Sequence, residues 1–260
     1  MTEKTASNRF IDLNCDMGEG FGAYSFGQDE PLLKYISSAN IACGFHAGDP
    51  HIMRETVRRC IASGVAVGAH PGLPDRLGFG RRDMAISPQE AYDYVLYQTG
   101  ALAAFVQAAG GRLNHVKPHG ALYHLAGRDP NVAEAVVKAV KAIDPALVLF
   151  GQAGSRLLEE ADRAGLPSAS EVFADRTYLA SGELTPRQRP GAIIHDAEAA
   201  VRQALSIVTH GIAECGDGSL LNLRADTICL HGDVPGAALF ADRLRSGLEA
   251  AGLTIRPPFS

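Results

Sequence analysis

The residues of this sequence that could do chemistry are imidazoles, carboxylates and basic side chains that follow short apolar runs. Imidazoles and carboxylates that converge on one site suit general acid–base hydrolysis or the binding of a divalent metal ion. Basic side chains beside them would bind an anionic substrate, a phosphate or a developing oxyanion. The candidates for catalysis are Asp16, His46, His70, Lys117, His119, Asp175, His231 and Asp233, and those for binding substrate or phosphate are Asn14, Glu19, Arg81 and Arg176.

Each candidate also has an ordinary structural interpretation. A single histidine at the end of a strand is as often a hydrogen-bonded structural residue as a catalyst. Asp49 precedes Pro50 and serves equally well as the N-cap of a helix. The run GFGRR at residues 78–82 would wrap a phosphate, or form a turn with solvated arginines. The set as a whole is the stronger signal, because stability alone does not explain such residues at several strand ends.

The elements that must position these residues are strands and helices in alternation. Short strand-like runs occur seven times, and most are nearly all apolar before a polar end, as expected of strands covered on both faces. No glycine-rich Rossmann fingerprint follows the first run, and glycine-rich loops follow several runs, which favours a closed barrel over an open sheet. The predicted strands cover residues 9–14, 38–45, 65–70, 113–119, 146–151, 170–175 and 227–233.

Helix start and stop signals separate these strands. Capping residues followed by proline open helices at positions 49, 87 and 129. Further helices are predicted at 155–164, 196–209 and 235–251, with at most a short one at 30–36. The long stretches 72–84 and 176–194 are expected to be lids or contact surfaces, and the turn at 216–218 predicts a local hairpin. We therefore predict one irregular seven-stranded (β/α) barrel domain over residues 1–260, with the candidates at the carboxyl face of its strands.

Composition excludes several classes of protein. The chain has 260 residues, 46% of them hydrophobic, and a net charge of −5 with no basic tail, which argues against nucleic-acid binding. No apolar run approaches the roughly 18 residues that a membrane span requires. The polar N-terminus lacks the apolar core of a secretory signal, and the five scattered cysteines indicate reduced thiols, so we expect a cytoplasmic protein.

Six stretches of the chain together resemble the LamB/YcsF family. They are DLNCDMGE (12–19), SANIACGFHAGD (38–49), GAHPGLPDRLGFGRR (68–82), VKPHGALY (116–123), EVFADRTY (171–178) and CLHGD (229–233). The resemblance runs from about residue 10 to about residue 256. It implies a barrel of the glycoside hydrolase and NodB-like deacetylase type.

The resemblance also implies an activity. It indicates ATP-dependent opening of the lactam of 5-oxo-L-proline to L-glutamate, with ADP and phosphate as products and Mg²⁺ accompanying ATP. It implies that the chain works with the partner 5-oxoprolinase subunits B and C, and a divalent metal bound in the barrel is compatible with it. Two alternatives stay open at this point: a metal-dependent, deacetylase-like hydrolase that does not use ATP, and a non-catalytic protein that binds substrate or serves as a scaffold.

Overall fold

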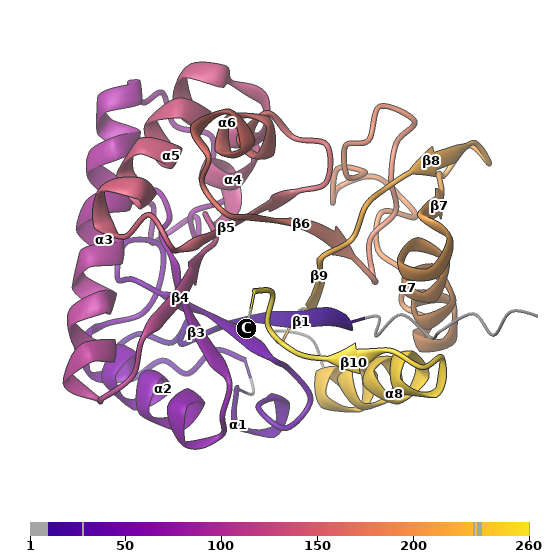
Figure 1. Cartoon of the computed structure of the whole chain (residues 1–260), viewed down its shortest axis with the longest axis horizontal. Coiled ribbons are helices and arrows are strands. Elements are labelled where there is room, and N and C mark those ends of the chain that lie inside the picture. Colours follow the sequence, from indigo (N-terminus) through magenta and orange to yellow (C-terminus); the bar gives the residue numbers. More distant parts are fainter. Residues whose placement is uncertain (1–9, 28, 231, 233–235, 260) are drawn as a thin grey trace, which may run out of the picture.

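Seven parallel strands close into a barrel at the centre of the molecule (Figure 1). The computed structural model describes residues 10–27, 29–230, 232 and 236–259. The strands follow one another around the barrel in chain order, and the last pairs with the first. This confirms the predicted seven-stranded (β/α) barrel. The barrel strands are β1 (Phe10–Met17), β2 (Ser38–Ala42), β3 (Ala66–His70), β4 (Leu113–Val116), β5 (Val148–Gln152), β6 (Ser168–Phe173) and β9 (Thr227–Leu230).

Helices surround the barrel and cover the outer face of its strands (Figure 1). The predicted helix starts are confirmed by their caps. The carboxylate of Asp49 accepts from the amides of His51 and Ile52, and Ser87 forms a capping box with Glu90. The helices are α1 (Asp29–Leu32), α2 (Pro50–Ala62), α3 (Pro88–Ala108), α4 (Gly120–Arg128), α5 (Pro130–Ile143), α6 (Arg156–Ala164), α7 (Ala197–His210) and α8 (Ala237–Ala250).

The strands are apolar on the face that meets the helices and partly polar on the face that lines the barrel. In β1, Leu13 and Cys15 are fully buried in the hydrophobic core, whereas Asn14 and Asp16 point to polar partners inside the barrel. Burial raises the pKa of the Cys15 thiol well above its usual value, as expected of a packed cysteine rather than a nucleophile.

Two elements, α4 and β10, were not predicted, and one predicted feature is confirmed. Residues 120–128 form α4, for which the sequence analysis predicts no helix, and its first residue, Gly120, has a left-handed φ of 53°. Strand β10 (Thr254–Ile255) adds to the edge of β1. The predicted hairpin is confirmed as β7 (Ile212–Glu214) and β8 (Leu220–Asn222), which pair antiparallel beside α7 (Figure 1).

In the described part of the chain, no helix has both the length and the apolar character needed to cross a membrane.

Candidate functional site

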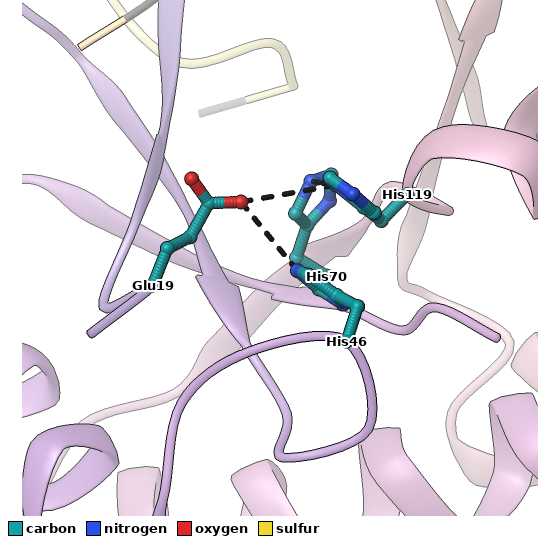
Figure 2. Close-up of side chains that lie close together, drawn as sticks. All are labelled: Glu19, His46, His70 and His119. Atoms are coloured by element: carbon teal, nitrogen blue, oxygen red, sulfur yellow. Dashed lines mark hydrogen bonds and ion pairs between the residues drawn. The ribbon is translucent and has the colours of Figure 1, made fainter. Parts of the chain in front are cut away.

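Three histidines and a glutamate converge at the carboxyl end of the barrel strands (Figure 2). Glu19 follows β1, His46 follows β2, His70 is the last residue of β3, and His119 is the N-cap of α4. Each offers one ligand atom, and these four atoms lie within 4.8 Å of one another. We call these four residues the histidine cluster. All four are among the sequence candidates.

The outer nitrogens of two histidines are fixed by backbone carbonyls. The Nδ1 of His70 lies 2.7 Å from the carbonyl oxygen of Lys117, and the Nε2 of His119 lies 2.8 Å from that of Phe79. A carbonyl oxygen only accepts hydrogen bonds, so each of these nitrogens carries a proton. The other two nitrogens, Nε2 of His70 and Nδ1 of His119, lie 2.9 Å apart. When both rings are neutral, each of these two nitrogens carries a lone pair that points at the other.

Two neutral lone pairs at this distance repel each other unless a cation lies between them. Two carboxylates add negative charge beside these nitrogens: Asp16 Oδ2 lies 3.2 Å from His70 Nε2, and Glu19 Oε1 lies 3.8 Å from His119 Nδ1. A proton or a metal ion satisfies this arrangement. Metal-binding histidines generally donate their second nitrogen to a carbonyl or carboxylate, as both histidines do here.

His46 completes the histidine cluster from the side. Its ring stacks on that of His119 with centroids 3.7 Å apart, and its Nε2 lies 3.5 Å from Glu19 Oε1. Both of its ring nitrogens are buried, and neither has a hydrogen-bond partner among the described residues. Because an unsatisfied buried polar group is costly, the Nε2 that faces Glu19 points to a ligand in the histidine cluster.

Burial keeps His46 and His119 uncharged and able to act as ligands. It lowers the pKa of His46 well below the usual value, and it lowers that of His119 to about 3. Burial acts to raise the pKa of Asp16, but His70 and Lys117 outweigh it and hold that pKa well below the usual range. Asp16 is therefore a fixed anion at the edge of the histidine cluster.

A buried lysine network lies directly beneath the histidine cluster. The Nζ of Lys117 lies 2.8 Å from Glu171 Oε1 and 3.1 Å from both Asp16 Oδ1 and Asn14 Oδ1. Burial alone would lower the pKa of Lys117, but the charges of Asp16 and Glu171 hold it well above its usual value. The structure thus places Asn14 and Lys117 together in this network.

The donor set of the histidine cluster supports a divalent cation. The carboxylates of Asp16, Glu19 and Glu171 share this region with the ammonium group of Lys117, and the positive charge of Arg81 also acts on His46 and His119. The residues therefore fit a divalent ion, and the imidazole-rich donor set suits Zn²⁺ and its first-row neighbours better than Mg²⁺.

Three residues of this network were missed by the sequence analysis. Glu171 lies inside β6 and is fully buried, and its Oε2 accepts from the hydroxyl of Tyr123 at 2.7 Å. Asn40 in β2 donates to Asn14 Oδ1 at 2.7 Å and to Asp16 Oδ1 at 2.8 Å. The available signal was a polar residue inside an apolar strand, because such a residue needs a buried partner.

The loop at 72–84 closes over the histidine cluster. Asp75 is its anchor: the carboxylate accepts from the Gly78 amide at 3.0 Å and from the Arg82 guanidinium. The amides of residues 78–82 all donate within the loop, which agrees with the turn rather than the phosphate-wrapping alternative for GFGRR. The Arg81 guanidinium lies over the Phe79 ring, 4.9 Å from its centroid.

The remaining candidates either contribute no ligand atom to the histidine cluster or lie outside the described residues. The Arg176 guanidinium donates to the carbonyls of Ala192 and Thr185 and holds the long loop at 176–194 together. Asp175 precedes it at the end of β6 and is half-buried. His231 and Asp233 lie outside the described residues.

The fold and the histidine cluster together define a class: a (β/α) barrel protein with a histidine–carboxylate centre at the carboxyl ends of its strands, where barrel enzymes carry their catalytic residues. The chain belongs to the LamB/YcsF family, which matches residues 11–260. This confirms the resemblance drawn from the six sequence stretches.

Similar proteins cover nearly the whole chain. A protein of Bacillus subtilis (strain 168), named as the A subunit of 5-oxoprolinase, is 55% identical, across 94% of this chain and 95% of its own. The relative from Bordetella pertussis with the same name is 54% identical, across 96% and 99%. The crystal structure of the lactam utilization protein from Thermus thermophilus has a TM-score of 0.90 at 51% identity, across 95% and 99%.

A more distant structure shares the fold alone. A family 4 carbohydrate esterase from Streptomyces lividans has a TM-score of 0.50 at 12% identity, across 96% of this chain and 93% of its own. The predicted likeness to deacetylase-type barrels is thereby confirmed at the level of architecture.

Proposed function

We propose that this chain opens the lactam ring of 5-oxo-L-proline as the A subunit of an ATP-dependent 5-oxoprolinase that also contains subunits B and C. Relatives above 50% identity carry the name of that A subunit over nearly their full length. The observation that carries the proposal is the histidine cluster, in which three oriented imidazoles and a carboxylate converge within 4.8 Å at the mouth of the barrel.

The chemistry explains why ATP is needed. A lactam is a poor electrophile, and transfer of the γ-phosphoryl group of ATP to its amide oxygen activates the ring carbon. Water adds to that carbon, the C–N bond breaks with the electron pair leaving on nitrogen, and γ-glutamyl phosphate results. A second water releases phosphate and leaves L-glutamate. Overall, 5-oxo-L-proline, ATP and two water molecules are converted to L-glutamate, ADP and phosphate.

The residues that would hold a divalent metal are His46, His70, His119 and Glu19. When bound, such an ion supplies Lewis-acid chemistry at the barrel mouth. Asp16 keeps a negative charge 3.2 Å from His70 and is our candidate for accepting a proton from the attacking water. Lys117 holds Asp16 in place from the opposite side, at 3.1 Å.

ATP enters as a co-substrate with Mg²⁺ as its counter-ion. Arg81 is our candidate for contacting the phosphates from this chain, because it is exposed on the loop that covers the histidine cluster. Its cation–π contact with Phe79 keeps the guanidinium close to the cluster.

Reconstitution tests this proposal. The chain is combined with subunits B and C, and glutamate and phosphate are measured from 5-oxo-L-proline with and without ATP. We expect equal amounts of both products, formed only when ATP and all three subunits are present. An assembled complex that hydrolyses no 5-oxo-L-proline in the presence of ATP would overturn the proposal. Release of a product by the chain alone without ATP would favour a deacetylase-like hydrolase instead.

A further inference from the structure

Phe79 has a backbone conformation that its residue type disfavours. Its φ is 55°, and Phe259 is the only other non-glycine residue with a positive φ among the residues described. Side chains other than glycine are strained in this left-handed region, so something must compensate. Both neighbours, Gly78 and Gly80, are glycines, yet the central position of the turn is a phenylalanine.

The carbonyl of Phe79 contacts the histidine cluster directly. It accepts the hydrogen bond from His119 Nε2 at 2.8 Å, and this bond places the proton on Nε2 and leaves a lone pair on Nδ1. That lone pair faces His70 Nε2 at 2.9 Å and Glu19 Oε1 at 3.8 Å. The other tautomer would aim a proton, not a lone pair, into the cluster.

The ring of Phe79 compensates for the strain and holds the turn down. It packs edge-on against His46 and His119, with centroids 5.7 and 5.3 Å apart, and Phe26 covers it at 4.8 Å. The turn has no space for a side chain at position 80, because a Cβ there would lie 2.7 Å from the Cβ of His46. The backbone therefore approaches the imidazoles closely, and the Phe79 ring fixes where its carbonyl points.

We propose that Phe79 is a positioning residue: its left-handed backbone, clamped by its ring, fixes the Nε2–H tautomer of His119 and so keeps the Nδ1 lone pair aimed at the histidine cluster. The effect on His119 requires no metal. The consequence for metal affinity rests on the proposed function, in which the histidine cluster holds a divalent ion.

Nitrogen-15 spectra of the histidines in the metal-free full-length chain test the effect on His119. We expect the single Nε2–H tautomer in the wild type and in Phe79→Tyr, which keeps the ring. Phe79→Ala and Phe79→Gly remove the ring, so we expect a mixture of tautomers in both. Phe26→Ala is a milder variant that uncovers the ring, with a smaller shift in the same direction. Met84→Ala, at an exposed position of the same loop, serves as the control.

Titration with Co²⁺, followed by its visible spectrum, tests the consequence for metal binding. We expect affinity to fall about 10- to 100-fold in Phe79→Ala and Phe79→Gly, as for loss of other supporting hydrogen bonds, and to stay unchanged in Phe79→Tyr and Met84→Ala. Wild-type tautomer and affinity in folded Phe79→Ala and Phe79→Gly would overturn the inference. A wild type that binds no Co²⁺ while the tautomer shift persists would contradict the metal site of the proposed function and support the role of Phe79.

Discussion

At the scale of residues, the pair His70 and His119 determines what the site can do. Each ring donates one proton to a backbone carbonyl, and the two remaining nitrogens meet at 2.9 Å. Neutral imidazoles repel in this geometry, and a bound cation turns the repulsion into coordination. The same two hydrogen bonds set which nitrogen of each ring is the ligand, so the site is organised before any ion arrives.

We expect the wild-type chain to bind one Zn²⁺ or similar ion, and His70→Ala to lose it. Removal of His70 deletes one donor and leaves Asp16 without its imidazole neighbour. Elemental analysis after dialysis measures the metal content. His210→Ala, which removes an exposed imidazole at the end of α7, is the matched control and should retain the ion. Equal metal content in both variants would contradict the assignment of ligands.

Asp12 gives a prediction about pH. Burial raises its pKa to about 6 from 3.8, although hydroxyls of Ser37, Thr227 and Ser38 donate to it. Because the folded state holds this proton more tightly than the unfolded chain, the contribution to stability is present below about pH 4 and is lost as the pH rises through 6. Relative to Asp12→Asn, the free energy of unfolding should fall by about 3 kcal/mol across this window. Urea titrations of both proteins at each pH measure the free energy of unfolding. If this free energy had the same pH dependence in the wild type and in Asp12→Asn, the prediction would be wrong.

At the scale of elements, the loop at 72–84 matters most, because it brings backbone rather than side chains to the histidine cluster. Its shape depends on Asp75, which gathers the Gly78 amide and the Arg82 guanidinium. The sequence predicts a lid or a contact surface for this stretch, and it leaves GFGRR open as either a phosphate-wrapping loop or a turn with solvated arginines. The structure shows a turn, in which the amides of Gly78 and Arg82 donate to the Asp75 carboxylate.

Replacement of Phe79 separates strain from packing. Phe79→Ala keeps the disfavoured backbone conformation, whereas Phe79→Gly removes that penalty, and both lose the ring. We expect the glycine variant to be more stable than the alanine variant by about 1 kcal/mol. Thermal or urea unfolding of the two variants measures the difference. An alanine variant as stable as the glycine variant would show that the turn relaxes to another conformation.

Sequence patterns predicted the elements better than the contacts between them. Seven apolar runs and the proline-marked helix starts suffice for the barrel, because both depend on local residue types. The sequence does not predict helix α4, because Gly120 and Asp129 at its two ends are residue types typical of turns. His46, His70 and His119 were predicted as candidates from their positions at strand ends. Their fixed tautomers depend on the carbonyls of Lys117 and Phe79, and a carbonyl has no signature in sequence.

At the scale of the whole molecule, one buried lysine links three barrel strands. Lys117 follows β4 and contacts Asp16 in β1 and Glu171 in β6. Asn14 joins the same network by donating to Glu171 Oε1 at 3.0 Å and to Thr227 of β9 at 2.7 Å. The network fills the barrel beneath the histidine cluster and supports it from within. Its members come from distant segments of the chain, so no local pattern could reveal it.

We therefore expect Lys117→Met to destabilise the fold strongly, because it leaves two buried carboxylates without their counter-ion. The loss should be about 3–5 kcal/mol in the free energy of unfolding. Lys138→Met is the matched control, since Lys138 pairs with Glu134 on the exposed face of α5, and its effect should stay below about 1 kcal/mol. Chemical denaturation measures both. Similar stability of the two variants would mean that the network contributes little to folding.

The central claim is that the histidine cluster is the catalytic centre of lactam opening. The most direct test is the rate of ATP-dependent glutamate formation by complexes assembled with subunits B and C and either the wild-type chain or His119→Ala. We predict a rate lower by roughly 10²–10⁴-fold for His119→Ala, with assembly intact and His210→Ala at the wild-type rate. A His119→Ala complex that turns over 5-oxo-L-proline at the wild-type rate would contradict the claim.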